Sequence, residues 1–308
     1  MKRRVRGCLL LFMVFAAVSA VGYGAMLIGS DHFVARYVAR TPRDPDTGIM
    51  HGAEQRDLIP PNPRGAVLLV HGFNGSPNNF HELPEQLAAA GWRAKAILLP
   101  GHGTTPYDFE KVTPAHLIAA VRTALAALQQ EHDTVVLLGH SMGGAIATIA
   151  AAETPPAALI LASPFFRVTH KWFYIFSAEH WANLTSPFVR WAPSVREPVN
   201  RPEARSQIVS YRWAPTRGIL TAIALAEAAG NPDLLTRITC PVLLVHSRLD
   251  QVTDPAAATA ALAQMPAAVK KTTWLTRSDH VIFWDYERDT VADAVANFLE
   301  QIDAKTAQ

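Results

Sequence analysis

The sequence is poor in cysteine and in charge, and each shortage excludes a class of protein. Its 308 residues include two cysteines, Cys8 in an apolar run and Cys240 beside an expected strand, so neither a disulfide framework nor a cysteine-based metal site is expected. Charged residues make up 18% and the formal net charge is +2, which is too small to predict nucleic-acid binding. Hydrophobic residues, at 49%, supply enough apolar surface for a substantial core and exclude global disorder.

Residues 1–30 predict a membrane segment. The basic start MKRRVRG precedes an uncharged run over residues 8–28, which is long enough to cross a bilayer as one helix. The basic cluster favours the cytoplasmic side, so the rest of the chain is expected on the exported side, the periplasm if the source is bacterial. The alternative is a cleaved signal peptide and a secreted protein, because VSA at 18–20 resembles a cleavage site. The run continues to Ile28, which favours an uncleaved anchor.

The rest of the chain predicts an α/β fold. Residues 31–63, rich in proline, glycine and charge, are expected to form a connector. Apolar segments that read as strands then alternate with segments that read as helices: strands at 66–70, 93–100, 134–139, 158–164, 241–247 and 270–276, helices at about 78–90, 113–130, 145–153, 254–265 and 290–302. Strands that are apolar throughout, each followed by a helix, indicate a mostly parallel central sheet flanked by helices.

The alternation is interrupted once. Residues 166–236 show no clear strand and carry many aromatic side chains, and a structureless loop of this length is improbable in a compact domain. We expect an inserted helical cap there, which divides the core into residues 64–165 and 237–308. A cap that leaves the sheet at the carboxyl ends of parallel strands would lie where such sheets bind ligands.

The segment LLGHSMGGAIA, residues 137–147, places Ser141 between Gly139 and Gly143. A sharp turn from strand to helix can hold a serine with its hydroxyl exposed above the sheet, and glycines on both sides let strand and helix approach closely. The pattern alone is weak and would also fit a tight turn with an incidental serine. Its position after an apolar strand and at the start of a helix predicts a nucleophile elbow.

A serine nucleophile needs a base and an acid that orients the base. Asp250 follows the fifth expected strand and His280 the sixth, so both are expected at the edge of the sheet where Ser141 lies. Asp254 and Asp279 are alternatives for the acid, but Asp254 is expected to begin the next helix and Asp279 adjoins the base. His246 lies inside an expected strand and is not assigned a role.

Acyl transfer also needs two N–H donors for the developing oxyanion. The backbone amide of Met142, directly after the nucleophile, is one candidate. The second is the amide of Phe73 in the turn HGFNGSP, where His71 is expected to bond the backbone. The turn LPGHGTTP at 99–106 is expected to shape the same rim.

Taken together, five motifs resemble the α/β-hydrolase superfamily, in its carboxylesterase and monoacylglycerol lipase branch, which is often grouped with serine aminopeptidase-like enzymes. They are HGF (71–73), PGHG (100–103), GHSMGG (139–144), SRLDQVTD (247–254) and SDHVIFWDYERD (278–289), and the resemblance spans residues 64–308. It implies a triad of Ser141, Asp250 and His280, with the Phe73 and Met142 amides as oxyanion donors.

The predicted function is hydrolysis of carboxylic esters of apolar acyl chains through an acyl-enzyme on Ser141, with no metal and no cofactor. The aromatic cap and the membrane segment favour small ester or lipid-derived substrates such as monoacylglycerols. An acyltransferase or an amidase/peptidase would use the same triad, and a non-catalytic binding protein on this scaffold is a further alternative. The sequence does not predict the oligomeric state.

Overall fold

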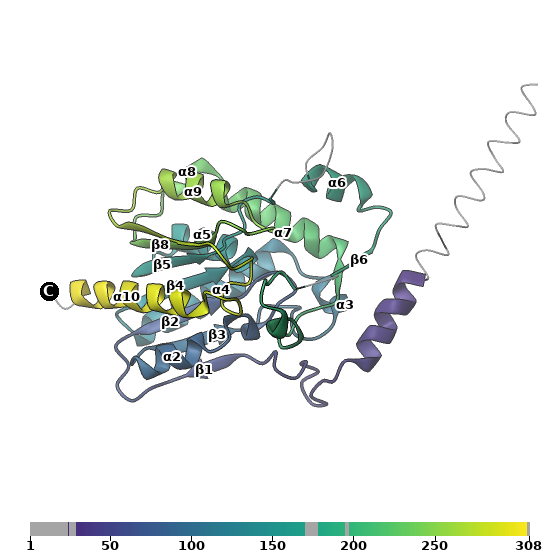
Figure 1. Cartoon of the computed structure of the whole chain (residues 1–308), viewed down its shortest axis with the longest axis horizontal. Coiled ribbons are helices and arrows are strands. Elements are labelled where there is room, and N and C mark those ends of the chain that lie inside the picture. The colour runs from purple at the N-terminus through teal and green to yellow at the C-terminus, as the bar shows by residue number, and fades with distance from the viewer. Residues whose placement is uncertain (1–23, 25–28, 170–177, 195–196, 307–308) are drawn as a thin grey trace, which may run out of the picture.

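A computed structural model describes the chain except for residues 1–23, 25–28, 170–177, 195–196 and 307–308 (Figure 1). The predicted membrane segment therefore lies almost entirely outside the described residues. Among the helices that the structure does describe, none combines the length and the apolar character that crossing a bilayer requires.

The centre of the molecule is a seven-stranded sheet in the order β1-β3-β2-β4-β5-β8-β9. All neighbouring strands are parallel except β1, which pairs antiparallel with β3. The predicted mostly parallel sheet is confirmed, and its strands are β1 (Arg56–Leu58), β2 (Ala66–Val70), β3 (Arg93–Ile97), β4 (Val135–His140), β5 (Ala158–Ala162), β8 (Val242–Ser247) and β9 (Lys270–Leu275).

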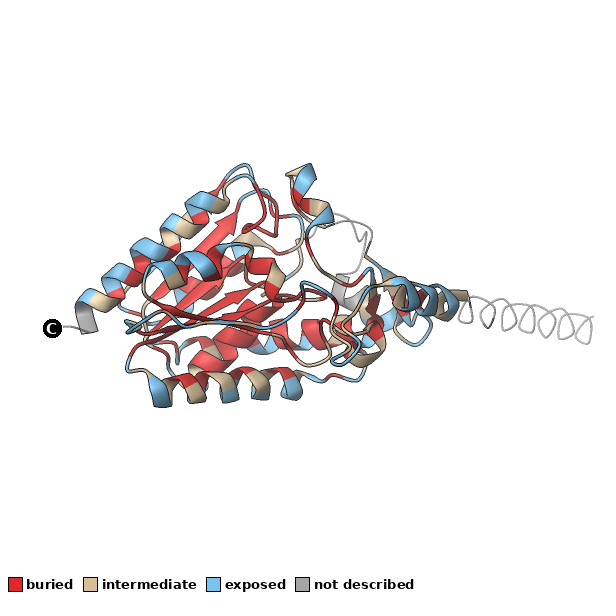
Figure 2. Ribbon diagram, turned by 90° about the horizontal axis from the view of Figure 1, so that it is seen from below, coloured by how far each residue is buried: buried red, intermediate tan, exposed pale blue. Residues whose placement is uncertain are grey.

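The sheet is covered on both faces, because the central strands β2 and β5 are apolar and buried at every position. Along β2, Leu68 and Val70 belong to one buried cluster, while Val67 and Leu69 belong to the other. The first cluster includes residues of α4 (Pro114–Glu131), α5 (Met142–Glu153), α7 (Thr216–Ala229) and α9 (Pro255–Gln264). The second includes residues of α2 (Leu83–Ala89) and α10 (Arg288–Thr306). Figure 2 shows the resulting buried layer through the middle of the molecule.

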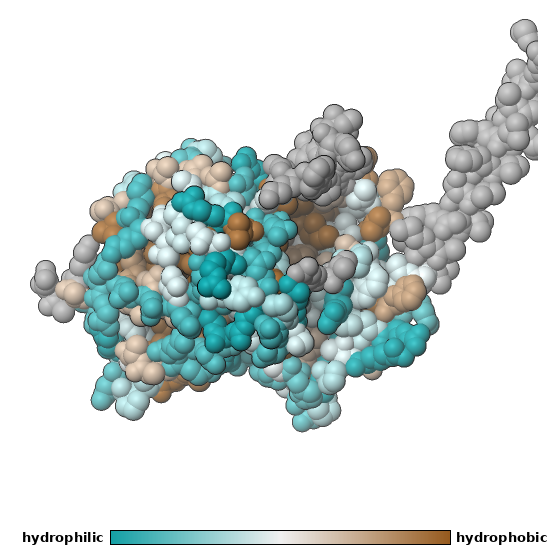
Figure 3. All heavy atoms as spheres, in the orientation of Figure 1, coloured by the Kyte–Doolittle hydropathy of each residue, from teal (hydrophilic) through white to brown (hydrophobic). Residues whose placement is uncertain are grey.

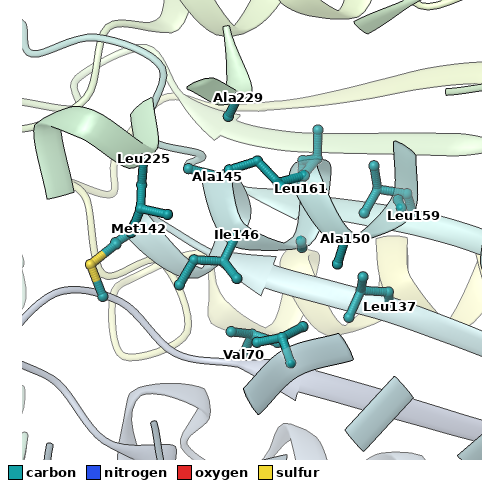
Figure 4. Close-up of a cluster of buried hydrophobic side chains, with 14 of the residues drawn as sticks. Val70, Leu137, Met142, Ala145, Ile146, Ala150, Leu159, Leu161, Leu225 and Ala229 are labelled. Carbon is teal, nitrogen blue, oxygen red and sulfur yellow. The ribbon is translucent and has the colours of Figure 1, made fainter. Parts of the chain in front are cut away.

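Helix α5, which follows Ser141, is buried over nearly its whole length. Figure 4 shows Met142, Ala145, Ile146 and Ala150 of this helix packed between side chains of the sheet and of α7. A surface helix would bury one stripe only. Helix α5 is enclosed instead, so its N-terminus and the turn before it are held in a fixed position.

Two expected elements differ from the structure. The single helix expected at 78–90 is divided into η1 (Pro77–Phe80) and α2, because His81 between them has a φ of 52° that no right-handed helix allows. The expected connector contains regular structure: residues 29–40 form a helix, and β1 extends the sheet by pairing with β3. A three-residue strand with no apolar alternation leaves no signal in a sequence.

The segment between β5 and β8 contains helices and also a short antiparallel ribbon. Strands β6 (Trp191–Pro193) and β7 (Trp213–Pro215) pair through Ala192 and Ala214, and both have the sequence WAP. The shorter elements of the chain are α3 (Pro106–Phe109), α6 (Ala178–Thr185), η2 (Pro202–Ser206) and α8 (Pro232–Leu235).

Candidate active site

Ser141 occupies a strained turn between β4 and α5, with φ 55° and ψ −121°. Such a conformation costs on the order of 1–3 kcal/mol for a residue with a side chain and must be imposed by its surroundings. A Cβ on Gly139 would lie 2.3 Å from the Gly143 carbonyl oxygen, and one on Gly143 would lie 2.1 Å from the Val70 oxygen. Strand and helix therefore meet backbone to backbone, which requires both glycines. The Ser141 amide donates to Ala162 of the next strand at 3.0 Å.

The structure brings Ser141, His280 and Asp250 together in one line of hydrogen bonds. His280 Nε2 lies 2.8 Å from Ser141 Oγ, and His280 Nδ1 lies 2.8 Å from Asp250 Oδ2. The three residues come from the ends of β4, β9 and β8, and each is at most 6% exposed. With the proton on Nδ1, the imidazole donates to the carboxylate and can accept the serine proton, which is the geometry of nucleophilic catalysis.

Asp250 is held as a carboxylate by donors on both of its oxygens. Oδ1 accepts the backbone amides of Val252 and Thr253 at 2.8 Å each, and Oδ2 accepts the Thr253 hydroxyl at 2.9 Å. Burial alone would raise the pKa of Asp250, but the charge of His280 and the hydrogen bonds from His246 and His280 hold that pKa far below its ordinary value. The acid therefore remains ionised and can stabilise a protonated base.

His246 is a second imidazole on the same carboxylate oxygen, a contact that the sequence analysis does not predict. The side chain is fully buried and its Nε2 lies 3.1 Å from Asp250 Oδ2. Its Nδ1 is buried without a partner among the described residues. A proton on Nε2 satisfies this arrangement, because a proton on Nδ1 would have no acceptor among the described residues. The available signal was a histidine in an otherwise apolar strand, four positions before Asp250.

The two alternative acids, Asp254 and Asp279, contact other groups instead of the base. Asp254 caps α9, accepting the Ala256 amide at 2.8 Å, and pairs with Arg167. Asp279 accepts the Gln251 amide at 3.0 Å. Asp250 is thus the one of the three candidates that contacts the imidazole of His280.

The two predicted oxyanion donors lie in the turns next to Ser141. Met142 is the first residue of α5, where backbone amides have no partner within the helix. Phe73 lies in the turn after β2, and in the described part of the chain neither amide donates a hydrogen bond. A Cβ on Gly72 would lie 2.9 Å from Ser141 Cβ, so this turn runs directly past the nucleophile. Both amides are thus without an acceptor in the described part of the chain, and their role as oxyanion donors stays a prediction.

Two buried histidines fix the loops around the nucleophile. His71 Nδ1 donates to the Gly72 carbonyl at 2.9 Å and Nε2 accepts the Leu99 amide at 3.1 Å, which meets the expectation that it bonds the backbone. Burial holds the pKa of His71 well below its ordinary value, so the acceptor nitrogen stays unprotonated. His140 Nε2 lies 3.1 Å from the carbonyl oxygen of His280 and ties the base to the elbow. The motif GHSMGG alone does not predict a role for His140 or its contact with the His280 carbonyl oxygen.

A cavity of about 330 Å³ opens beside Ser141 and His280. The segment between β5 and β8 supplies much of its lining, including Ala192, Pro193 and Ala214 of the β6–β7 ribbon. Among the described residues that line this space, Glu197 carries the one acidic side chain; burial raises its pKa, and it accepts the Ser210 hydroxyl. The sequence around Glu197, PSVREPVN, carries no motif that would have indicated it. Among the described residues no cluster of His, Cys, Asp or Glu could hold a metal ion.

Known proteins with similar sequences and folds include several named lipases and esterases. A thermostable monoacylglycerol lipase from Bacillus sp. (strain H-257) is 28% identical over 251 residues, which cover 82% of this chain and 96% of that protein. A carboxylesterase of Bacillus subtilis (strain 168) is 24% identical over 77% of this chain and 93% of its own length. A structure from a study of two metagenome-derived lipolytic enzymes, LipS and LipT, superposes with a TM-score of 0.74 at 25% identity and covers 82% of this chain and 99% of that one.

The family profile described as serine aminopeptidase, S33, matches residues 61–287, a range that includes Ser141, Asp250 and His280. The match extends over most of the chain, over four of the five motifs that carry the resemblance to α/β-hydrolases, and over the fifth as far as residue 287. The chain therefore belongs to the serine aminopeptidase S33 family of α/β-hydrolase serine hydrolases.

Proposed function

We propose that this protein hydrolyses esters of apolar acyl groups, monoacylglycerols among them, with Ser141, His280 and Asp250 as its catalytic triad. The enzyme is a serine hydrolase that acts on ester bonds. The observation that carries the proposal is the pair of 2.8 Å contacts that join the serine to the imidazole and the imidazole to a buried carboxylate. The relatives named monoacylglycerol lipase and carboxylesterase support the same reaction.

In the first step His280 Nε2 accepts the proton of Ser141 as Oγ attacks the ester carbonyl. The Phe73 and Met142 amides, together with the N-terminus of α5, stabilise the negative charge on the carbonyl oxygen. His280 then donates its proton to the departing alcohol, which leaves an acyl group on Ser141. Water, deprotonated by the same imidazole, releases the acid. Asp250 fixes the imidazole and stabilises its charged form throughout.

The segment of residues 166–236 serves as a cap over this site. Its ribbon supplies Ala192, Pro193 and Ala214 to the lining of the cavity, and Ile219 of α7 adds another apolar contact. A largely apolar wall beside the nucleophile suits the acyl part of an ester more than a charged chain. Glu197 and the neighbouring Ser194 and Ser210 form a polar patch that suits a hydroxylated leaving group.

Residues 8–28 anchor the enzyme in a membrane, with the catalytic domain on the exported side. The support is the uncharged run itself and the basic residues before it. Carbonate extraction of membranes and N-terminal sequencing of the mature protein test this. A soluble protein that begins near residue 21 would show a cleaved signal peptide instead.

The activity test compares the full chain with Ser141→Ala, both in mild detergent. Substrates are p-nitrophenyl esters from acetate to palmitate, a monoacylglycerol, and an aminoacyl p-nitroanilide. We expect ester turnover by the unchanged enzyme only, with a chain-length optimum that reports the size of the cavity. Faster turnover of the anilide would favour a peptidase. Transfer to an added alcohol in preference to water would favour an acyltransferase, and no turnover at all would favour a binding protein.

A further inference from the structure

The helix of residues 29–40 is bound to the ribbon that lines the cavity. Arg190 Nη1 lies 3.0 Å from both carboxylate oxygens of Asp31, and Trp191 Nε1 donates to Asp31 at 2.5 Å. Phe33 stacks on Trp213, with 6.5 Å between ring centroids. Because Trp191 and Trp213 begin the two strands of the ribbon, the helix contacts both of them.

Arg190 and Asp31 also contact residues of the α/β core. Arg190 binds both carboxylate oxygens of Glu110, just after α3, at 2.8 Å each. The Tyr107 hydroxyl donates to the Asp31 carbonyl at 3.4 Å, and its ring meets Trp191 edge-on at 5.0 Å. Helix, ribbon and core are thus joined around one guanidinium group, and the helix is not a free tether.

This helix directly follows the apolar run. Asp31 lies three residues after Ile28, the last residue of the uncharged segment. Three residues extend over at most about 10 Å, and over about 4.5 Å if they are helical. If residues 8–28 cross a bilayer, Arg190 and the start of the ribbon are therefore held at its surface. No linker long enough to let the domain move away from the bilayer lies between Ile28 and Asp31.

Exposed apolar side chains lie in the same part of the molecule. Phe33 on the N-terminal helix is 58% exposed, Leu184 in α6 is 59% and Phe188 after α6 is 58%. Figure 1 places α6 and the N-terminal helix at one end of the molecule, with the C-terminus of α10 at the other. In the same orientation Figure 3 shows hydrophobic atoms between α6 and the N-terminal helix, and others elsewhere on this face. Large apolar side chains beside a membrane anchor fit a lipid surface.

We propose that the face formed by the N-terminal helix, α6 and the β6–β7 ribbon lies on the bilayer, so that the cavity beneath the ribbon receives its ester substrate from the membrane. We call this surface the membrane face. The inference rests on the proposed function of an anchored ester hydrolase. It adds the orientation of the domain and the source of the substrate, and it identifies the Asp31–Arg190 pair as the contact that keeps the ribbon at the lipid surface.

The orientation is tested by fluorescence quenching in lipid vesicles. A single fluorophore is attached to Leu184→Cys in the full chain, in a background with Cys8→Ser and Cys240→Ser. Gln301→Cys, exposed near the C-terminal end of α10, provides the control. We expect lipids that carry a nitroxide to quench the label at 184 and to leave the label at 301 unchanged. Equal quenching at both positions, or stronger quenching at 301, would overturn the proposed orientation.

The coupling is tested by Asp31→Asn. Asp303→Asn is the matched control, because Asp303 pairs with Arg64 at the opposite end of the molecule with similar exposure. We expect Asp31→Asn to lower kcat/KM for a monoacylglycerol in vesicles by about two- to fivefold, the range that one exposed ion pair supports. Turnover of dissolved p-nitrophenyl butyrate should not change, and Asp303→Asn should change neither.

An equal loss on both substrates would overturn the coupling and leave the ion pair a purely structural role. If the unchanged enzyme hydrolyses neither substrate, the proposed function fails. The quenching measurement then still decides the orientation, so the two failures are distinguishable.

Discussion

Replacing Asp250 by asparagine should invert the hydrogen bonding of the triad although the side chain keeps its shape. Oδ1 accepts the backbone amides of Val252 and Thr253 at 2.8 Å each, and backbone amides can only donate. The asparagine oxygen must stay on them, so its NH₂ takes the place of Oδ2, where His280 Nδ1 lies at 2.8 Å. Nδ1 then has to accept and the imidazole proton moves to Nε2. In that tautomer His280 cannot take the proton of Ser141.

We expect kcat of Asp250→Asn to fall by about 10³- to 10⁴-fold, since the same change of tautomer in a serine protease triad costs about 10⁴. Stability should fall as well, because His246 Nε2 donates to the same oxygen at 3.1 Å and would face a second donor. Moving the His246 proton to Nδ1 does not help, since that atom has no partner among the described residues. One buried unsatisfied donor costs about 1–3 kcal/mol of unfolding free energy.

The assay measures p-nitrophenyl ester turnover and urea unfolding for Asp250→Asn, His246→Leu and the double variant. Leucine removes the donor that opposes the new amide, so the double variant should be more stable than the sum of the single effects predicts. Its activity should remain as low as that of Asp250→Asn. A kcat for Asp250→Asn within about tenfold of the unchanged enzyme would refute the reasoning, because the base would then be oriented by another group.

Three further predictions follow from buried groups. Burial holds the pKa of His71 well below 6.5 and lowers those of His102 and His140 to about 4 and about 3, so only the unfolded chain takes up these protons just below pH 6.5. The free energy of unfolding should fall from pH 6.5 towards 4, by up to about 1.4 kcal/mol per pH unit for each histidine; urea titrations that are flat from pH 7 to 5 would contradict this. Gly143→Ala should abolish soluble expression or lower Tm strongly, because a Cβ there would lie 2.1 Å from a backbone oxygen of β2. Glu197→Leu should lower kcat/KM for a monoacylglycerol about tenfold relative to an alkyl ester of the same acid. This factor corresponds to the loss of one hydrogen bond from a substrate hydroxyl to a charged acceptor. An equal loss on both substrates would exclude recognition of the free hydroxyls.

The central strands could be predicted because their residues are apolar on both faces, a pattern that is typical of buried parallel strands. A run such as AVLLV at 66–70, apolar on both faces and ending at a glycine-containing turn, fits a strand buried between two helix layers. The elements that were missed have no such pattern. Strand β1 is only partly buried and depends on its partner β3, and the ribbon strands are three residues long. The division of the helix expected at 78–90 rests on the backbone angle of one residue, His81, which its residue type does not reveal.

The residues of the site fall into two groups: those that a sequence motif predicts, and those whose contacts depend on packing. Ser141, Asp250 and His280 each follow the end of a predicted strand within four residues, so the topology of a parallel sheet was sufficient to bring them to one edge. His246 also lies on β8, but its role depends on which side of the strand it faces and on how far the chain turns before Asp250. Those quantities are set by the packing of β8 between β5 and β9, where a one-residue change of register would move the imidazole to the other face. Sequence periodicity assigns the residue to a strand, and only the three-dimensional register assigns it to the carboxylate.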